Sequence, residues 1–518
     1  MTTATTAENP ILQGFYPDPS LCRVGEDFYL VNSSFGYFPG IPLFHSRDLA
    51  HWEQVGNILD RREQLPLENC EISRGIFAPT IRYHKGWFYV ITTNVDRGGN
   101  FIVKAPSPQG PWSNPYYLGE QALGIDPSLF FEEDGTCYYV GTRPNPEGPG
   151  YNGDWEIWIQ ELDLETMSLV GQPRKIWKGA MARPIWPEGP HLYRIGEYYY
   201  LIHAEGGTAM EHSIMAARSK SLEEPFEGCP FNPVFTHRHL GKQYPVACAG
   251  HGDLFDDPQG NWYMVLLASR LSDGWGSMGR ETFLAKVEWQ DGWPVVNPGV
   301  GKLEERVELP LEEYRFPKEA GEPGIFHFVG ETLDDRLVSI CAPREDFCSL
   351  KERPGCLRLF SREESPETKG SFSYVGARQG SHTFQASIWM DAGSLQEGEG
   401  AGLLLYQNHA NHLKMEVKAL KDRNIFSVTE VIQGKEKILC EQPTEGASLE
   451  ILLRGEHQKG QVFLDYGRGR IPAAGAIPLW PYTTEAAGGF VGCTIGMFVS
   501  SYGRKSRGWA DFGWMSIS

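Results

Sequence analysis

The chain has 518 residues, too many for a single hydrophobic core, so two or more domains are expected. Its net charge of −19 argues against a nucleic acid partner and against binding to an anionic membrane surface. An acidic surface on an aromatic-rich chain suits a neutral polar ligand such as a sugar, and is explained equally well by solubility alone.

The first residues, 1–8, contain no basic region and no apolar core, so no secretory signal is expected. The chain has no run of 18 apolar residues, and a membrane span is therefore not expected either. The ten cysteines form no CxxC pair, which favours buried free thiols in a reducing compartment. These features together predict a cytoplasmic protein.

One two-part pattern recurs five times in the first 300 residues. A short element with proline or glycine leads into an apolar strand, and a turn then leads into a strand centred on a tyrosine. The five starts are Asp18-Pro19-Ser20-Leu21, Ala78-Pro79-Thr80-Ile81, Asp126-Pro127-Ser128-Leu129, Glu188-Gly189-Pro190-His191-Leu192 and His251-Gly252-Asp253-Leu254. The tyrosines are Tyr29, Tyr89, Tyr139, Tyr200 and Tyr263, separated by 60, 50, 61 and 63 residues.

Helical periodicity is scarce, whereas short strands and glycine, proline or aspartate turns recur, so the chain is predicted to be all-β. Each repeat is long enough for about four strands, the size of one propeller blade. Residues 1–311 are therefore predicted to form a five-bladed β-propeller whose inner strands begin at the five starts.

The tyrosine pattern does not recur after the propeller. Residues 312–325 are rich in charge, Pro and Gly and are predicted to be a linker. Alternating strands follow, for example at 383–390 and 402–406, and residues 510–517 are typical of a closing strand. Residues 326–518 are therefore predicted to form a β-sandwich accessory domain.

Three of the five starts carry a carboxylate, and we expect all three at the same place in the repeat: Asp18, Asp126 and Glu188. Inner strands of a propeller converge on its axis, so these groups should lie close together and titrate as a coupled set. One can then stay protonated while another stays ionised, the condition for acid–base chemistry. A single Asp-Pro-Ser is more often a turn, but three carboxylates in register favour a catalytic site.

Several motifs occur in a fixed order along the propeller. They are Tyr16-Pro17-Asp18-Pro19-Ser20, Phe38-Pro39-Gly40-Ile41, His45-Ser46-Arg47-Asp48-Leu49, Ala78-Pro79-Thr80-Ile81-Arg82-Tyr83, Ile125-Asp126-Pro127-Ser128-Leu129 and Glu188-Gly189-Pro190. This ordered set resembles glycoside hydrolase family 43, in particular its two-domain β-xylosidase and α-L-arabinofuranosidase branch.

The resemblance implies an inverting mechanism in which Asp18 is the general base, Glu188 the general acid, and Asp126 the carboxylate that orients the acid and tunes its pKa. Inversion requires a water between base and sugar, so the two working carboxyls should lie about 6.5–9.5 Å apart. An ionised Asp126 would raise the pKa of the acid by like-charge repulsion.

The resemblance also places Arg280 in the sugar pocket. Motif position makes Phe35, Phe38 and Phe77 candidates for stacking on the sugar. Thr208 is a candidate for the same subsite, and is explained equally well as a turn residue. Two positions depart from the family pattern: Phe77 stands where tryptophan is expected, and Ile125 where many relatives carry an aromatic residue. The pocket wall, and with it the sugar preference, should therefore differ. The segment 498–502 is the candidate for a lid contributed by the sandwich domain.

His251 opens the fifth repeat and is expected to point into the channel. Relatives often hold Ca²⁺ there through such a histidine and several waters. Calcium prefers oxygen ligands, so a hydrogen-bonded histidine without metal is an equally good interpretation. No organic cofactor is expected.

The sequence thus predicts an exo-acting glycosidase that releases terminal xylose, arabinofuranose or both from xylo-oligosaccharides and arabinoxylan fragments. An endo-arabinanase, or a sugar-binding propeller without catalysis, are the alternatives. The sequence leaves the oligomeric state open, and a homo-oligomer is compatible with it.

Overall fold

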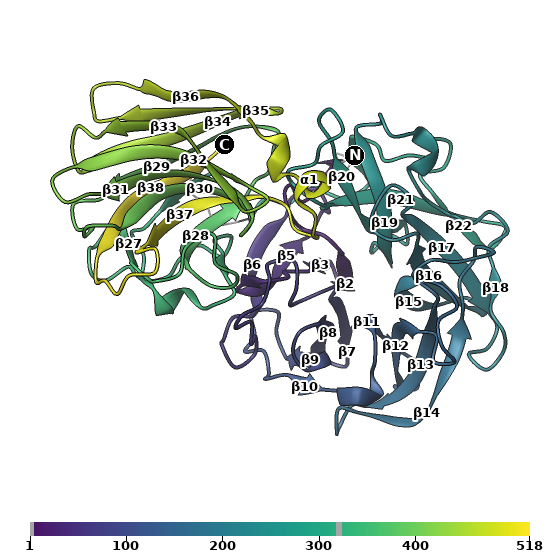
Figure 1. Ribbon diagram of the computed structural model, residues 1–518. Helices are drawn as coiled ribbons and strands as arrows, with labels where there is room; N and C mark the ends of the chain where they lie inside the picture. The colour runs from purple at the N-terminus through teal and green to yellow at the C-terminus, as the bar shows by residue number, and fades with distance from the viewer. Residues whose placement is uncertain (1–4, 317–323) are drawn as a thin grey trace.

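The computed structural model describes residues 5–316 and 324–518, and its regular secondary structure is almost entirely β-strand (Figure 1). The short helical segments are η1 (Gly119–Gln121), η2 (Arg238–Leu240), η3 (Arg344–Asp346), η4 (Trp480–Tyr482) and α1 (Thr484–Ala487). In the described ranges no helix is long and apolar enough to cross a membrane.

Five four-stranded antiparallel sheets fill the first 300 residues. The first holds β2 (Ser20–Val24), β3 (Asp27–Val31), β5 (Gly40–Ser46) and β6 (Glu53–Leu59), and the second β7 (Thr80–His84), β8 (Trp87–Asn94), β9 (Gly99–Ala105) and β10 (Tyr116–Tyr117). The third holds β11 (Ile125–Phe131), β12 (Cys137–Pro144), β13 (Trp155–Asp163) and β14 (Ser168–Trp177). The fourth holds β15 (Glu188–Ile195), β16 (Tyr198–Glu205), β17 (Ser213–Ser219) and β18 (Glu227–Gly228), and the fifth β19 (Val246–Asp256), β20 (Trp262–Arg270), β21 (Glu281–Gln290) and β22 (Trp293–Val296).

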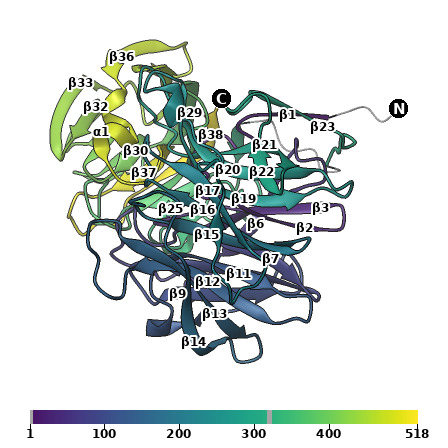
Figure 2. The ribbon, with the colours of Figure 1, turned by 90° about the vertical axis from the view of Figure 1, so that its right-hand side faces the viewer.

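The five sheets surround a common centre, as in a β-propeller (Figure 1). The strands β2, β7, β11, β15 and β19 lie nearest to it, and β19 contacts β2, so the ring closes. Four of these strands begin within two residues of a predicted repeat start, whereas β19 begins at Val246, five residues before His251. Closure is reinforced outside the sheets, where β1 (Thr5–Glu8) pairs antiparallel with β23 (Arg306–Leu309) (Figure 2).

Local sequence explains the hairpins within each sheet. Lys85 (φ 47°) and Gly86 (φ 86°) form a two-residue turn between His84 and Trp87, which are paired across β7 and β8. Positive φ at both positions is the geometry of a type I′ turn, whose twist matches that of paired strands. This turn joins the first two strands of the second sheet.

The second domain is a sandwich of two sheets stacked face to face, to the upper left in Figure 1. One sheet runs in the order β26 (Cys348–Ser349), β27 (Leu357–Phe360), β38 (Trp509–Ile517), β29 (Thr383–Asp391), β34 (Ser448–Glu456), β35 (Lys459–Asp465), β36 (Ile471–Pro478), with β24 (Ile325–His327) also on β38. The other runs β28 (Ser373–Arg378), β37 (Thr494–Ser500), β30 (Gly400–Asn408), β31 (Asn411–Ala419), β32 (Asn424–Ile432), β33 (Lys435–Pro443).

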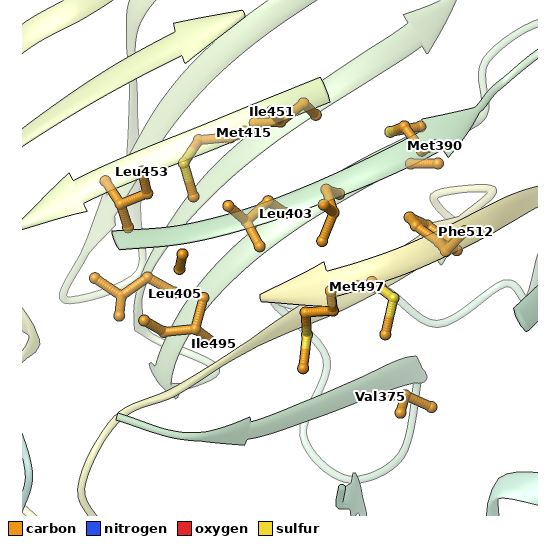
Figure 3. Close-up of a cluster of buried hydrophobic side chains, with 14 of the residues drawn as sticks. Val375, Met390, Leu403, Leu405, Met415, Ile451, Leu453, Ile495, Met497 and Phe512 are labelled. Carbon is orange, nitrogen blue, oxygen red and sulfur yellow. The ribbon is translucent and has the colours of Figure 1, made fainter. Parts of the chain in front are cut away.

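Apolar side chains from both sheets interdigitate in the core of the sandwich (Figure 3). Met390 and Phe512 come from one sheet, and Leu403 and Met497 from the other, and all four are buried. The predicted strands at 383–390, 402–406 and 510–517 lie inside β29, β30 and β38. A β-propeller followed by a β-sandwich is therefore confirmed.

The two domains share an extensive buried interface. The short strand β25 (Ser339–Ile340) pairs with β4 (Tyr37–Phe38) of the propeller in a separate two-stranded sheet that joins the two domains. Tyr374 and Phe498 of the sandwich pack in one apolar cluster with Phe15 and Tyr37. Of the predicted linker, residues 317–323 lie outside the described residues, and β24 begins at Ile325.

Candidate active site

A cavity of about 420 Å³ opens where the inner strands of the propeller begin. Seven side chains predicted for catalysis or sugar binding line it: Asp18, Asp126, Glu188, Arg280, Phe35, Phe77 and Thr208. His251 lines it as well. The structure therefore brings together side chains from all five sheets and from the loops beside them.

Phe38 is the exception among the predicted sugar-binding residues. It does not line this cavity, because its strand β4 pairs with β25 and the ring is 3 % exposed beneath the sandwich domain. It borders a different cleft, between the domains. The assignment of Phe38 to the sugar pocket is wrong: the residue supports the interface.

The backbone at the repeat starts explains how the side chains reach the cavity. Asp18 (φ 52°), Asp126 (φ 52°) and His251 (φ 47°) are left-handed, as is Gly189 (φ 58°). Non-glycine residues rarely adopt this conformation, and such strain concentrates at functional sites. The expectation of three carboxylates at one repeat position needs correction, because Gly189 occupies that position in the fourth repeat and Glu188 precedes it. The irregular pairing of β15 between Glu188 and His191 accommodates the offset.

Asp18 is held by two hydrogen bonds in a buried setting. Arg280 donates from Nη1 to Oδ1 at 2.8 Å, and Ser33 donates from Oγ to Oδ2 at 2.5 Å. Burial alone would raise the pKa of Asp18, but Arg280, His251 and the Ser33 hydrogen bond outweigh it and hold the pKa below its ordinary value. Asp18 is therefore ionised near neutral pH.

The other two carboxyls are shifted in the opposite direction. Burial raises the pKa of Asp126 to about 6. The charge of Asp18 also raises this pKa, whereas His251 lowers it. Burial also raises the pKa of Glu188 well above its ordinary value, and the charges of Asp126 and Asp18 raise it further. One cavity thus combines an ionised carboxylate with a carboxyl that keeps its proton, which is the requirement for paired base and acid catalysis.

An aromatic wall closes one side of the cavity, and part of it comes from the sandwich domain. Phe490 stacks on Phe35 with ring centroids 6.0 Å apart and contacts Phe77 edge-on at 5.9 Å. Its backbone N–H donates to Ser73 Oγ of the propeller at 3.0 Å. The predicted lid at residues 498–502 is wrong, because residues up to Ser500 belong to the buried strand β37. The sandwich reaches the cavity through the loop after α1 instead.

Two tryptophans in the lining, Trp155 and Trp186, were not anticipated from the sequence. Trp186 has a left-handed backbone (φ 46°), and its N–H donates to the carbonyl of Gly153 at 2.9 Å. A Cβ on Gly207 would lie 2.8 Å from its ring, so Gly207 leaves room for the indole. The only sequence signal was its position two residues before Glu188.

Beneath the cavity, a buried ion pair joins the inner strands. Arg82 contacts Asp253 with both terminal nitrogens, Nη1 to Oδ2 at 2.9 Å and Nη2 to Oδ1 at 3.1 Å. Ser20 Oγ donates to the same carboxylate at 2.7 Å, and the hydroxyl of Tyr193 also donates to it. Four of the five sheets are thus tied together directly below the catalytic residues.

Comparison with known proteins places the chain in a family. A family model described as "Glycosyl hydrolases family 43" matches residues 7–294, more than half of the chain. The chain belongs to glycosyl hydrolase family 43. A second model, "Beta xylosidase C-terminal Concanavalin A-like domain", matches residues 326–518.

Relatives of this glycoside hydrolase cover its whole length. It is 58% identical to a xylosidase/arabinosidase of Butyrivibrio fibrisolvens over 99% of both chains. It is 37% identical to a non-reducing end alpha-L-arabinofuranosidase of Bacteroides ovatus, with 99% of this chain and 94% of the relative covered. The solved structure of a xylan beta-1,4-xylosidase from Bacillus halodurans superposes with a TM-score of 0.92 at 32% identity, covering 99% of this chain and 100% of that one.

The residues around His251 offer no cluster of protein ligands for a metal ion in this glycoside hydrolase. Throughout residues 5–316 and 324–518, no three or more His, Cys, Asp or Glu side chains are grouped so that they could hold one. The nearest carboxylate oxygen to His251 is Oδ1 of Asp18, 3.7 Å from Nδ1, and Arg280 already binds that oxygen. The calcium prediction therefore gains no support from the donor set, and no catalytic step is assigned to a metal.

Proposed function

We propose that this family 43 glycoside hydrolase is an inverting, exo-acting enzyme that releases terminal xylose, arabinofuranose or both from xylo-oligosaccharides and arabinoxylan fragments. The observation that carries the proposal is the opposed pKa shifts of Asp18 and Glu188 in one cavity. The names of the relatives from Butyrivibrio fibrisolvens and Bacteroides ovatus support this choice of sugars.

In this mechanism the ionised Asp18 accepts a proton from a water that attacks the anomeric carbon. Glu188 donates its proton to the leaving glycosidic oxygen on the opposite face of the ring. Asp126, charged at neutral pH next to Glu188, keeps that proton in place until the leaving group takes it. Arg280 holds the base in its ionised form and in a fixed orientation.

The shape of the cavity favours exo action. Phe490 closes one side of a space of about 420 Å³, and an endo-arabinanase would need a groove that is open at both ends. A non-catalytic sugar-binding site is disfavoured because sugar binding alone requires no protonated Glu188 opposite an ionised Asp18. The five sheets correspond, in this proposal, to five propeller blades within residues 1–311, with the accessory domain at 326–518.

Aryl glycosides test the assignment of Glu188. In Glu188→Gln, hydrolysis of an aryl xyloside with a poor leaving group should fall by roughly 10²–10⁴-fold, the usual worth of general acid catalysis. A dinitrophenyl xyloside needs little protonation and should lose far less. Equal losses on both substrates, or none, would exclude Glu188 as the acid.

The stereochemical outcome gives an independent test. Proton NMR of the first product formed should show the anomer opposite to that of the substrate. Retention of configuration would overturn the inverting mechanism while leaving the glycosidase assignment intact.

A further inference from the structure

A second cavity, of about 320 Å³, lies between the propeller and the sandwich, away from the catalytic residues. Its wall includes Gln13 and Tyr16 from the segment before β2, Phe326 from β24, and Arg378 at the end of β28. Arg336 lines it as well. The lining thus holds two arginines, and among its described residues there is no aspartate or glutamate side chain. Ser518, the last residue of the printed sequence, also borders the cavity.

Arg378 is the unusual residue in this cavity. It is 8% exposed, and its guanidinium lies over the ring of Tyr16, 4.5 Å from the centroid. In residues 5–316 and 324–518, its guanidinium donates no hydrogen bond to a protein acceptor and forms no ion pair, and its Nε is fully buried without a partner. The second ring near the guanidinium is that of Tyr37, at 5.7 Å. Burying a charge without a counter-charge is costly, so a partner from outside the chain is expected.

The other deeply buried arginine shows the contrast. Arg280 is 7% exposed and pairs with Asp18 at 2.8 Å. Of the two arginines that are more than nine-tenths buried in the described chain, only Arg378 therefore lacks a carboxylate.

Two neighbouring groups offer further hydrogen-bond donors to the cavity. Arg336 uses Nε and Nη2 on Asp334, at 2.9 and 2.7 Å, and packs over Phe326 at 4.8 Å, so its Nη1 is not used in that pair. The hydroxyl of Tyr16 makes no hydrogen bond in the described part of the chain and can donate one.

We propose that this interdomain cavity is a binding site for a small oxyanion, with Arg378 as its principal ligand. A planar guanidinium binds phosphate, sulfate or carboxylate through two parallel hydrogen bonds, and a partly desolvated setting strengthens such bonds. Inorganic phosphate or sulfate and the carboxylate of a sugar acid share this chemistry.

A bound anion would stabilise the interface between the two domains. Arg378 belongs to the sandwich, whereas Tyr16 belongs to the propeller, where its carbonyl accepts from Asn32 Nδ2 at 3.0 Å and Thr282 Oγ1 at 2.7 Å. An anion held between them would add a bridge that only the assembled protein can form, so it should raise the melting temperature of the whole chain.

Thermal unfolding of the full chain tests this inference. At constant ionic strength, replacing chloride by inorganic phosphate or sulfate should raise Tm by roughly 2–6 °C. Arg378→Gln should lose the anion-dependent rise, and Arg378→Lys should keep part of it. The matched control is Arg454→Gln, because Arg454 is exposed and stacks on Phe463 at 5.4 Å outside the cavity. An equal rise in wild type and Arg378→Gln would overturn the proposal.

Direct binding keeps the test decisive if Arg378→Gln folds poorly. Calorimetric titration of the wild-type protein with phosphate, sulfate and D-glucuronate, with D-glucose as the uncharged control, distinguishes an inorganic anion from a sugar acid. Selenate soaked into crystals should give an anomalous peak beside Arg378. No peak there, together with no heat from any of the three anions, would show that the cavity is not an anion site.

Discussion

Arg280 and Asp18 form a buried ion pair of 2.8 Å between residues that lie 262 positions apart in the chain. Asp18 precedes β2 of the first sheet, and Arg280 precedes β21 of the last. The pair therefore forms only when the ring of sheets closes. Folding of the propeller and ionisation of the catalytic base are coupled through this contact.

Removing the cation should shift the pH dependence of the enzyme. In Arg280→Met, Asp18 loses the strongest influence that lowers its pKa, while burial, which raises it, remains. Because the base works only when ionised, the acidic limb of kcat/KM against pH should move to higher pH. The value at neutral pH should fall by about 10²-fold.

Ser33→Ala provides the graded control for this shift. It removes only the hydrogen bond to Oδ2 of Asp18, so the limb should move in the same direction by a smaller amount. An unchanged limb in Arg280→Met would contradict the assignment of Asp18 as base.

The side chain of Glu188 should lower the stability of the folded protein at neutral pH. Its folded-state pKa is raised, first by burial and then by Asp126 and Asp18, so the folded state favours the protonated form. When the pKa of a carboxyl is higher in the folded than in the unfolded state, the protein loses stability as the pH rises from the unfolded-state pKa through the folded-state pKa. Glu188→Gln carries no such charge and should melt about 1–3 °C above the wild type at pH 8. The difference should vanish near pH 4, where Glu188 is protonated in both the folded and the unfolded state. Glu8→Gln, which removes an exposed carboxylate paired with Arg306, should not reproduce it.

The aromatic contact from the sandwich should contribute to substrate binding. Phe490→Ala removes a ring that stacks on Phe35 at the wall of the cavity, so KM for aryl xylosides should rise about 5–30-fold with a smaller change in kcat. Phe490→Tyr, which keeps the ring, should remain near wild type. If both variants left KM unchanged, the sandwich domain would have no part in the site.

The repeat predicted most of this architecture because its signal is local. Turns such as Lys85-Gly86 and the strands that they join follow from neighbouring residues, so the propeller and the convergence of Asp18, Asp126 and Glu188 could be inferred from the sequence. The one-residue offset of Glu188 from Asp18 and Asp126 could not be inferred, because Gly189 takes the left-handed position of the repeat only in the fourth copy.

The remaining errors concern contacts between distant segments. Phe38 was placed in the pocket because its motif resembles the family, but pairing with β25, about 300 residues away, buries it at the interface. Phe490 was missed because nothing in its own neighbourhood marks it, and it reaches Phe35 only after the two domains dock. No periodicity or turn signal specifies such docking.

Chelation should leave catalysis intact. His251 faces Asp18, whose Oδ1 already pairs with Arg280, and its surroundings offer no cluster of metal ligands among the described residues. Initial rates on aryl xyloside and aryl arabinofuranoside should therefore stay within about twofold after EDTA. His251→Ala should slow both reactions, since His251 helps to lower the pKa of Asp18. Loss of activity in EDTA with recovery on added calcium would contradict this and establish the metal.

The ion pair between Arg82 and Asp253 should be the most sensitive point of the propeller. Asp253 is fully buried, and although burial raises its pKa, Arg82, His191 and the hydrogen bonds of Arg82 and Tyr193 hold the pKa well below its ordinary value. Its contribution to stability is therefore present above the unfolded pKa of about 4 and is lost only in strong acid.

Asp253→Asn leaves Arg82 charged and unpaired in the interior, which should cost about 3–5 kcal/mol in urea unfolding. Pairing it with Arg82→Met should recover part of that loss, because the orphaned charge is gone. The exposed pair of Arg306 and Glu8 is the matched control: Glu8→Gln should cost less than about 1 kcal/mol. A loss equally small in Asp253→Asn would mean that the centre of the ring is held by packing rather than by this network.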